Sequence, residues 1–210
     1  MIVTDTALYE RIRGALIGCA LGDAMGMPTE MWTREKIKKT FPEGINTFLP
    51  AQSDDILGRD LCAGSITDDT INTVMILEMI ASQKGLLDVK KYIDQLMFWY
   101  KSDDISAAVT GPSTKKALEL IEKGISFEET GKMGTTNGAA MKISPVGFVS
   151  DYRDLAVLVH RVAQICMPTH NTNIAITGAS IIAACVSYGI SGGRSVDYLW
   201  DLAMDVIEAS

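Results

Sequence analysis

Three consecutive oxygen-bearing side chains, Thr67, Asp68 and Asp69, precede an apolar segment over residues 71–80. A hydroxyl followed by acidic residues is typical of the first turn of a helix, where the helix dipole favours carboxylates. Two adjacent carboxylates repel each other unless water or a cation neutralises them. Their oxygens suit a hard divalent ion such as Mg²⁺ or Mn²⁺. Helix capping with a solvated acidic turn is the alternative interpretation.

A second chemically suggestive segment, residues 131–141, is rich in glycine, threonine and alanine. Small residues let a backbone approach a ligand closely, and amides and hydroxyls ahead of a short helix favour phosphate oxygens. The segment is not a Walker loop, because it lacks the Gly-Lys-Ser/Thr ending. An ordinary glycine-rich connection is the alternative.

Single acidic and imidazole side chains provide further candidates. Asp23 and Glu30 follow the predicted end of the first helix, where a carboxylate that faces water is the simpler expectation. His170 lies between Thr169 and Asn171 at a predicted helix start, where it could contact a ligand. His160 falls inside a helical pattern and is expected to be structural.

The elements that must position these residues are predicted to be helices. Apolar residues recur at helical spacing in about eight segments, and no segment shows sustained alternation, so the fold class is all-α in a single domain over 1–210. The first helix is expected over 6–21, ending near Gly22, with Gly14, Gly18 and Gly22 allowing a neighbouring helix to approach closely. Pro145 is expected to end or kink a short helix.

Composition narrows the partners and the compartment. The net charge is −7 without a long basic cluster, so nucleic acid is not an expected partner. Polar residues and glycines interrupt the apolar run over 174–190, so no membrane span is expected. The N-terminus lacks a secretory signal pattern, and the four cysteines form no Cys-x-x-Cys pair. A cytoplasmic protein with free thiols is the expectation.

Taken together, four sequence motifs resemble, in their order along the chain, those of the ADP-ribosylglycohydrolase family. This family includes dinitrogenase-reductase-activating glycohydrolase and the eukaryotic ADP-ribosyl hydrolases. The motifs are Arg13-Gly14-Ala15-Leu16-Ile17-Gly18 with Gly22-Asp23-Ala24-Met25-Gly26, Ser65-Ile66-Thr67-Asp68-Asp69-Thr70, Thr136-Asn137-Gly138-Ala139-Ala140-Met141, and Thr169-His170.

The resemblance implies an all-helical domain with a two-metal Mg²⁺ or Mn²⁺ centre that removes ADP-ribose from a modified arginine or serine side chain. It implies that Thr67, Asp68 and Asp69 bind metal, and that Glu30 and Asp68 take part in catalysis. The expected partner is an ADP-ribosylated protein or a small ADP-ribose derivative. The residues expected to contact ADP-ribose are Gly134, Thr135, Thr136, Asn137, Gly138 and His170.

The sequence departs from the family pattern at one place. Family members carry a late Asp-x-Asp-Thr string that completes the metal site, and these 210 residues do not contain it. The expectation is therefore a domain that lacks its C-terminal part and whose metal site is open on one side. Two alternatives stay open: hydrolysis of free ADP-ribose derivatives or nucleosides, and a non-catalytic relative that binds ADP-ribose or has a structural role.

Overall fold

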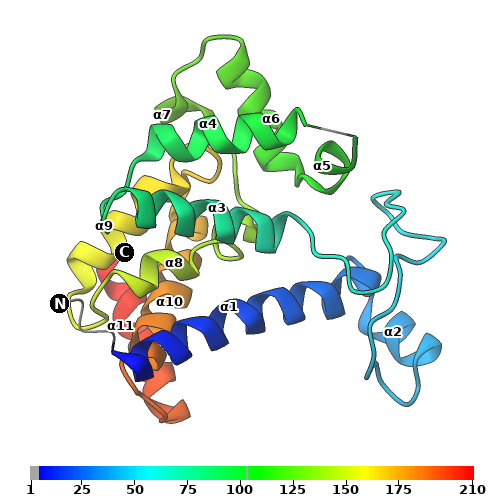
Figure 1. Ribbon diagram of the computed structural model, residues 1–210, viewed down its shortest axis with the longest axis horizontal. Helices are drawn as coiled ribbons and strands as arrows, with labels where there is room; N and C mark the ends of the chain where they lie inside the picture. The colour runs from blue at the N-terminus through cyan, green and yellow to red at the C-terminus, as the bar shows by residue number, and fades with distance from the viewer. Residues whose placement is uncertain (1–4, 103) are drawn as a thin grey trace.

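The computed structural model describes residues 5–102 and 104–210, and every regular element among them is helical, which confirms the all-α class (Figure 1). The elements are α1 (Thr6–Gly26), η1 (Met27–Thr29), α2 (Arg34–Thr40), α3 (Asp68–Ser82), α4 (Val89–Tyr100), α5 (Asp104–Val109), α6 (Pro112–Glu122), α7 (Phe127–Thr130), η2 (Asn137–Ala139), α8 (Ser144–Phe148), α9 (Leu155–Cys166), α10 (Asn173–Ile190) and α11 (Val196–Ala209). The short helices η1 and η2 are 3₁₀ turns.

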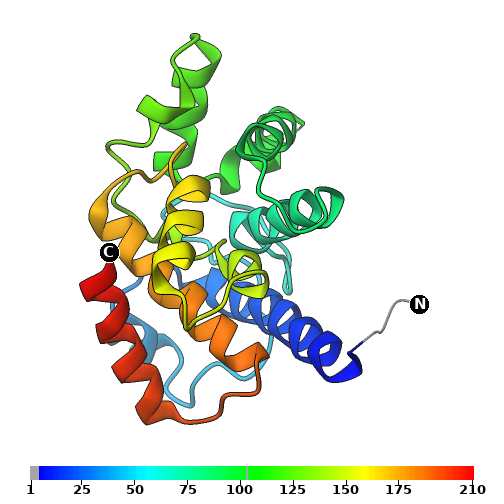
Figure 2. The same cartoon turned by 90° about the vertical axis from the view of Figure 1, so that its left-hand side faces the viewer.

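Helix α10 is the centre of the packing. It contacts α8, α9, α11, η2 and α1, and Figure 2 shows it running between α9 and α11. Small residues on α10 allow these approaches, because Ala179, Ala183 and Ala184 are fully buried there. The largest apolar side chains of the core come from other helices and from the residue that precedes α8, namely Ile76, Met79, Tyr92, Leu96, Leu118, Ile143, Leu158 and Ile165.

The apolar character of α10 also bears on the membrane prediction. Its 18 residues, Asn173–Ile190, have a mean hydropathy of 1.6 and meet the length and composition of a membrane span, contrary to the expectation from its interrupted apolar run. It is the one such helix among the described residues. Its contacts with the neighbouring helices bury 39% of these residues, which gives part of its hydropathy a structural reason.

Helix α1 differs from the prediction at its end and along one face. It continues past Gly22 to Gly26 and passes directly into η1. The predicted close approach of another helix at its glycines is wrong, since a Cβ on Gly14, Gly18 or Gly22 would have no atom within 4 Å. The glycines face away from the neighbours of α1, and Ala24 is the single buried residue within the helix. In Figures 1 and 2, α1 lies along the edge of the fold.

Three smaller predictions are also corrected or refined. Pro145 does not end a helix but lies in the first turn of α8, where its missing N–H costs no helical hydrogen bond. All four cysteines are free, as predicted, although Cys62 is exposed and only Cys166 is fully buried. His160 is exposed on α9 and has no part in the core.

Candidate active site

A cavity of about 440 Å³ opens where the end of α1, the start of α3, the start of α6 and η2 converge. Carboxylates from the first two elements face hydroxyls and backbone groups from the last two. The polar side chains in its lining are Asp23, Glu30, Thr67, Asp68, Asp69, Ser113, Thr114, Thr136, Asn137 and His170. The lining contains four carboxylates and neither lysine nor arginine, so the cavity favours cationic groups.

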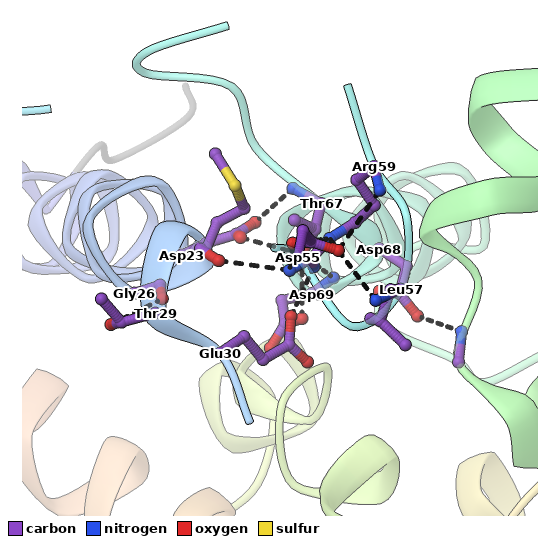
Figure 3. A network of polar contacts seen from close by, with 12 residues as sticks. Asp23, Gly26, Thr29, Glu30, Asp55, Leu57, Arg59, Thr67, Asp68 and Asp69 are labelled. Atoms are coloured by element: carbon purple, nitrogen blue, oxygen red, sulfur yellow. Dashed lines mark hydrogen bonds and ion pairs between the residues drawn. The ribbon is translucent and has the colours of Figure 1, made fainter. Parts of the chain in front are cut away.

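Asp23 holds the start of α3 in place. One carboxylate oxygen accepts hydrogen bonds from the Thr67 amide at 2.8 Å, the Thr70 amide at 3.2 Å and the Thr70 hydroxyl at 2.6 Å. The other accepts from the Thr67 hydroxyl at 2.8 Å (Figure 3). The predicted water-facing carboxylate is therefore wrong for Asp23: because α1 continues to Gly26, its carboxylate points at α3 and caps it from outside.

The Thr67 hydroxyl lies between two carboxylates and has one proton to share. Its oxygen is 2.8 Å from Asp23 Oδ1 and 3.0 Å from Asp69 Oδ2. A hydroxyl can donate to only one of them at a time. The remaining close carboxylate oxygen needs another proton or a cation, which is the electrostatic demand predicted for this helix start.

Asp68 is the most buried carboxylate of the site. Only 6% of its surface is exposed, and one oxygen accepts a hydrogen bond from the Gly111 amide at 3.1 Å. Burial, with smaller contributions from the charges of Asp69 and Glu30, raises the pKa of Asp68 to about 7. Burial and the charge of Asp23 also raise the pKa of Asp69. The site therefore holds negative charge at a cost that a bound cation would remove.

The donor set fits a hard divalent cation in type but is incomplete in number. Asp68, Asp69 and the Thr67 hydroxyl supply oxygen ligands, as Mg²⁺ or Mn²⁺ requires. Within residues 5–102 and 104–210, however, no three His, Cys, Asp or Glu side chains converge as a metal site. Asp68, Asp69 and Thr67 would therefore hold a cation from one side of the cavity.

Glu30 reaches the cavity from the turn after η1 and is held there by Arg59. The Arg59 side chain is only 2% exposed. Its guanidinium contacts Glu30 at 2.5 Å and Asp55 at 2.7 Å, and it also donates to the Met27 carbonyl at 3.2 Å (Figure 3). Arg59 thereby pins the long segment between α2 and α3 to the end of α1. The Glu30 side chain stays 47% exposed, so it can contact both water and the cavity.

The wall opposite the carboxylates comes from η2 and from the turn before α10. Thr136, Asn137 and Gly138 line it, and the buried His170 places Nε2 at 2.9 Å from the Thr136 hydroxyl. Gly138 must be glycine here, because a Cβ would lie 2.6 Å from His170 Cε1. The structure thus brings these four predicted residues to one cavity together with Glu30, Thr67, Asp68 and Asp69.

Gly134 and Thr135 are not part of this cavity. Gly134 lines a separate hollow of about 250 Å³ beside Thr169 and Lys116. A Cβ on Gly134 would lie 2.1 Å from the Thr169 carbonyl oxygen, so packing against the backbone accounts for this glycine. Thr135 is exposed on the segment between Gly134 and Thr136.

This close packing predicts opposite effects for two glycine substitutions. Gly134→Ala is expected to destabilise the fold by about 3 kcal/mol, because the backbone of Thr169 must move to admit the methyl group. Gly18→Ala is expected to stabilise it by up to about 1 kcal/mol, since α1 has open space there and alanine favours helix. Urea unfolding of both variants measures the difference. Equal effects of the two substitutions would contradict this packing.

The buried His170 predicts a pH dependence of stability. Burial, and secondarily the charge of Lys142, lowers the pKa of His170 to about 3. An unfolded histidine is protonated near pH 6.5, whereas the native His170 stays neutral until a much lower pH. Acidification therefore stabilises the unfolded state relative to the native state. At pH 5 the free energy of unfolding should be about 2 kcal/mol lower than at pH 7.5 because of this histidine. Urea unfolding at the two pH values measures the difference, and His170→Asn should not show it. His160→Asn, at an exposed position, is the control that should retain it.

Several lining residues were not predicted from the sequence. Gly111 and Ser113 come from the start of α6, and Met141 follows η2. The buried Lys142, whose ammonium donates to Thr169 Oγ1 at 2.8 Å, was also missed. A lysine within an apolar stretch after the glycine-rich segment is the signal that could have indicated it.

The fold and the cavity define an all-helical protein with a carboxylate-rich site. A family profile described as ADP-ribosylglycohydrolase matches residues 4–210, so the chain belongs to the ADP-ribosylglycohydrolase family, as its motifs predicted. The uncharacterized protein YegU of Escherichia coli K12 is 36% identical over 184 residues, which are 87% of this chain. ADP-ribosylarginine hydrolase Tri1 of Pseudomonas putida GB-1 is 27% identical over 206 residues, or 94% of this chain.

A solved structure shows the same fold. The protein described as an ADP-ribosylglycohydrolase-related protein complex aligns with 93% of this chain at a TM-score of 0.69 and 25% identity. The chain spans 55% of YegU, 51% of Tri1 and 61% of that structure. It therefore corresponds to a little over half the length of these relatives.

Proposed function

We propose that this chain binds an ADP-ribosylated arginine side chain in the cavity at the start of α3 and contributes to hydrolysis of the bond between ribose and the guanidinium. The observation that supports this most is the clustering of Asp68, Asp69 and Glu30 opposite Thr136 and His170 in one cavity. The name of the relative Tri1, an ADP-ribosylarginine hydrolase, supports arginine as the acceptor.

Charge favours the same orientation of the substrate. The carboxylate side of the cavity attracts a guanidinium or a metal ion and repels phosphate. The pyrophosphate is therefore placed toward the opposite wall, where the amides of Thr136–Gly138 and the first turn of α6 offer neutral donors. Family resemblance and charge thus both support this orientation of the ligand.

Asp68, Asp69 and Thr67 would hold a Mg²⁺ or Mn²⁺ ion from one side of the cavity. When bound, such an ion orients ribose hydroxyls and increases the acidity of nearby water. The Gly111 amide donates to one Asp68 oxygen and thereby fixes the orientation of the carboxylate. The other Asp68 oxygen is left to bind the ion. Asp23 positions this group by holding Thr67 rather than by touching substrate.

Glu30 is the candidate acid or base. Cleavage at ribose C1 passes through an oxocarbenium-like state, so a water must lose a proton as the bond to the leaving nitrogen breaks. Glu30 is partly exposed, ion-paired with Arg59 and directed at the cavity, which suits a carboxylate that accepts this proton. Arg59 keeps the carboxylate in reach and contributes no proton itself.

The test is release of ADP-ribose from a peptide ADP-ribosylated on arginine, measured by chromatography with Mn²⁺ and with a chelator. Wild-type protein should release ADP-ribose only with the metal, and Asp69→Ala should reduce the rate by roughly 100-fold or more. Asp94→Ala, which removes an exposed carboxylate on α4, is the matched control and should leave the rate unchanged. A serine-linked peptide and free ADP-ribose derivatives in parallel identify the bond that is cleaved.

Two results would contradict the proposal. Release that persists in chelator, or that Asp69→Ala leaves intact, would separate the reaction from this cavity. Binding of ADP-ribose without release from any substrate would favour a non-catalytic binding protein.

A further inference from the structure

Beneath the η2 wall, four side chains form a continuous line of hydrogen bonds, which we call the relay: Lys142, Thr169, His170 and Thr136. Lys142 Nζ donates to Thr169 Oγ1 at 2.8 Å. The same oxygen lies 2.9 Å from His170 Nδ1, and Nε2 on the far side of the ring lies 2.9 Å from Thr136 Oγ1. The relay therefore runs from the core to the lining of the cavity.

Lys142 is an unusual group at the inner end. Its side chain is fully buried, and Tyr92, whose ring centroid is 5.5 Å from Nζ, covers it. Tyr92 in turn donates to Asn72 Oδ1 at 2.7 Å, and Asn72 donates to the Asp68 carbonyl at 2.8 Å. Burying an ammonium costs free energy, so we expect Lys142 to have a structural or functional role that offsets this cost.

The direction of the relay follows from hydrogen-bond chemistry. An ammonium only donates, so it occupies one lone pair of the Thr169 oxygen. Among the described residues, His170 Nδ1, 2.9 Å away, is the neighbour placed to receive the hydroxyl proton of Thr169. A neutral imidazole that accepts at Nδ1 carries its proton on Nε2, and this proton is then donated to Thr136.

The outer end of the relay is a hydroxyl whose proton has only a weak acceptor. Thr136 Oγ1 accepts from the ring and keeps its own proton, for which Ser113 Oγ at 3.5 Å is a long and weak acceptor. Both Thr136 and Ser113 line the cavity. Burial and the charge of Lys142 also lower the pKa of His170, so the ring stays neutral near pH 7.

We propose that Lys142 is a positioning residue that sets the direction of the relay, so that the Thr136 hydroxyl presents its proton to an acceptor oxygen of the ligand. A non-bridging phosphate oxygen is the acceptor of this kind in ADP-ribose. The direction of the relay is a property of the chain itself, whereas the ligand at its end rests on the function proposed above.

The experiment is ¹⁵N NMR of protein labelled at histidine, at pH 7, where ring nitrogen shifts distinguish the two tautomers. Only His160 and His170 contribute, and His160→Gln assigns the signals. Wild-type His170 should be a single tautomer with the proton on Nε2. A proton on Nδ1, or a doubly protonated ring, would overturn the proposal.

Variants then test the cause. Lys142→Met should give mixed tautomers, because no ammonium then donates to the Thr169 oxygen and opposes a second N–H directed at it from the ring. An unchanged single tautomer in the folded variant would overturn the role of Lys142. Thr169→Val removes the hydroxyl that connects Lys142 to His170, so it should also give mixed tautomers. It serves as the test if Lys142→Met does not fold. Thr136→Val, at the exposed end, should keep the Nε2 proton, and a change there would mean that the cavity end sets the tautomer.

Calorimetric titration with ADP-ribose separates this proposal from the proposed function. Thr136→Val should weaken binding about tenfold while the tautomer stays as in wild type. The predicted tautomer without any ADP-ribose binding would leave the relay intact and contradict the function. Binding of ADP-ribose together with a proton on Nδ1 of His170 would contradict the relay and leave the proposed function intact.

Discussion

Replacing Asp68 by asparagine is expected to stabilise the cation-free chain and to abolish hydrolysis. Three pKa units correspond to roughly 4 kcal/mol, and we expect a gain of about 2 kcal/mol near pH 8 because the buried amide also loses water. The amide oxygen can still accept from the Gly111 amide. Thermal melting with chelator and with Mn²⁺ measures the gain, and the metal should stabilise wild type more than the variant.

The pH dependence gives the same prediction an independent check. The native state keeps the Asp68 proton up to about pH 7, whereas an unfolded aspartate loses it near pH 4. This group therefore lowers stability as the pH rises between these values, and Asp68→Asn should lack that slope. Asp88→Asn, which keeps a side-chain cap on α4, is the control and should change little. A loss of stability in Asp68→Asn at pH 8 in chelator would refute the assigned cost of burial.

Replacing Asp23 by alanine is expected to destabilise the chain by about 3 kcal/mol. Four hydrogen bonds from Thr67 and Thr70 converge on this carboxylate, and bonds to a charged acceptor are worth more than neutral ones. Their loss also frees the start of α3, so metal affinity and activity should fall with stability. Urea unfolding and metal titration measure the two effects.

Asp5→Ala provides a matched comparison for Asp23→Ala. Asp5 also caps a helix, accepting from the amides of Ala7 and Leu8, but it does so at an exposed end remote from the cavity. Its loss should cost at most about 1 kcal/mol and leave activity unchanged. If Asp23→Ala proved no more harmful than Asp5→Ala, the carboxylate would not be the anchor of α3.

The sequence predicted what local chemistry determines. The start of α3 could be predicted because its capping hydroxyl and its first-turn acids are consecutive residues, Thr67, Asp68 and Asp69. The same residues indicated that the two adjacent carboxylates need a positive charge nearby. The order of the four motifs predicted the family. Helical periodicity likewise predicted the all-α class and most of the long helices.

Residues whose roles depend on distant partners were the ones misjudged. Asp23 lies 44 positions before Thr67, and nothing in its own surroundings shows that α1 extends far enough to aim it at α3. Arg59 lies in an irregular segment and acts on Glu30, 29 residues away. The α1 glycines and Gly134 were misread in opposite senses, since only tertiary structure shows which glycine faces open space and which faces a carbonyl.

Diffraction from a crystal of this chain grown with Mn²⁺ and ADP-ribose is the most direct test of the site. The anomalous signal of manganese should lie against the carboxylate oxygens of Asp68 and Asp69, with the diphosphate on the η2 side next to Thr136. Manganese elsewhere on the protein, with only water against those two carboxylates and the nucleotide outside the cavity, would contradict the proposed site and the hydrolase activity inferred from it.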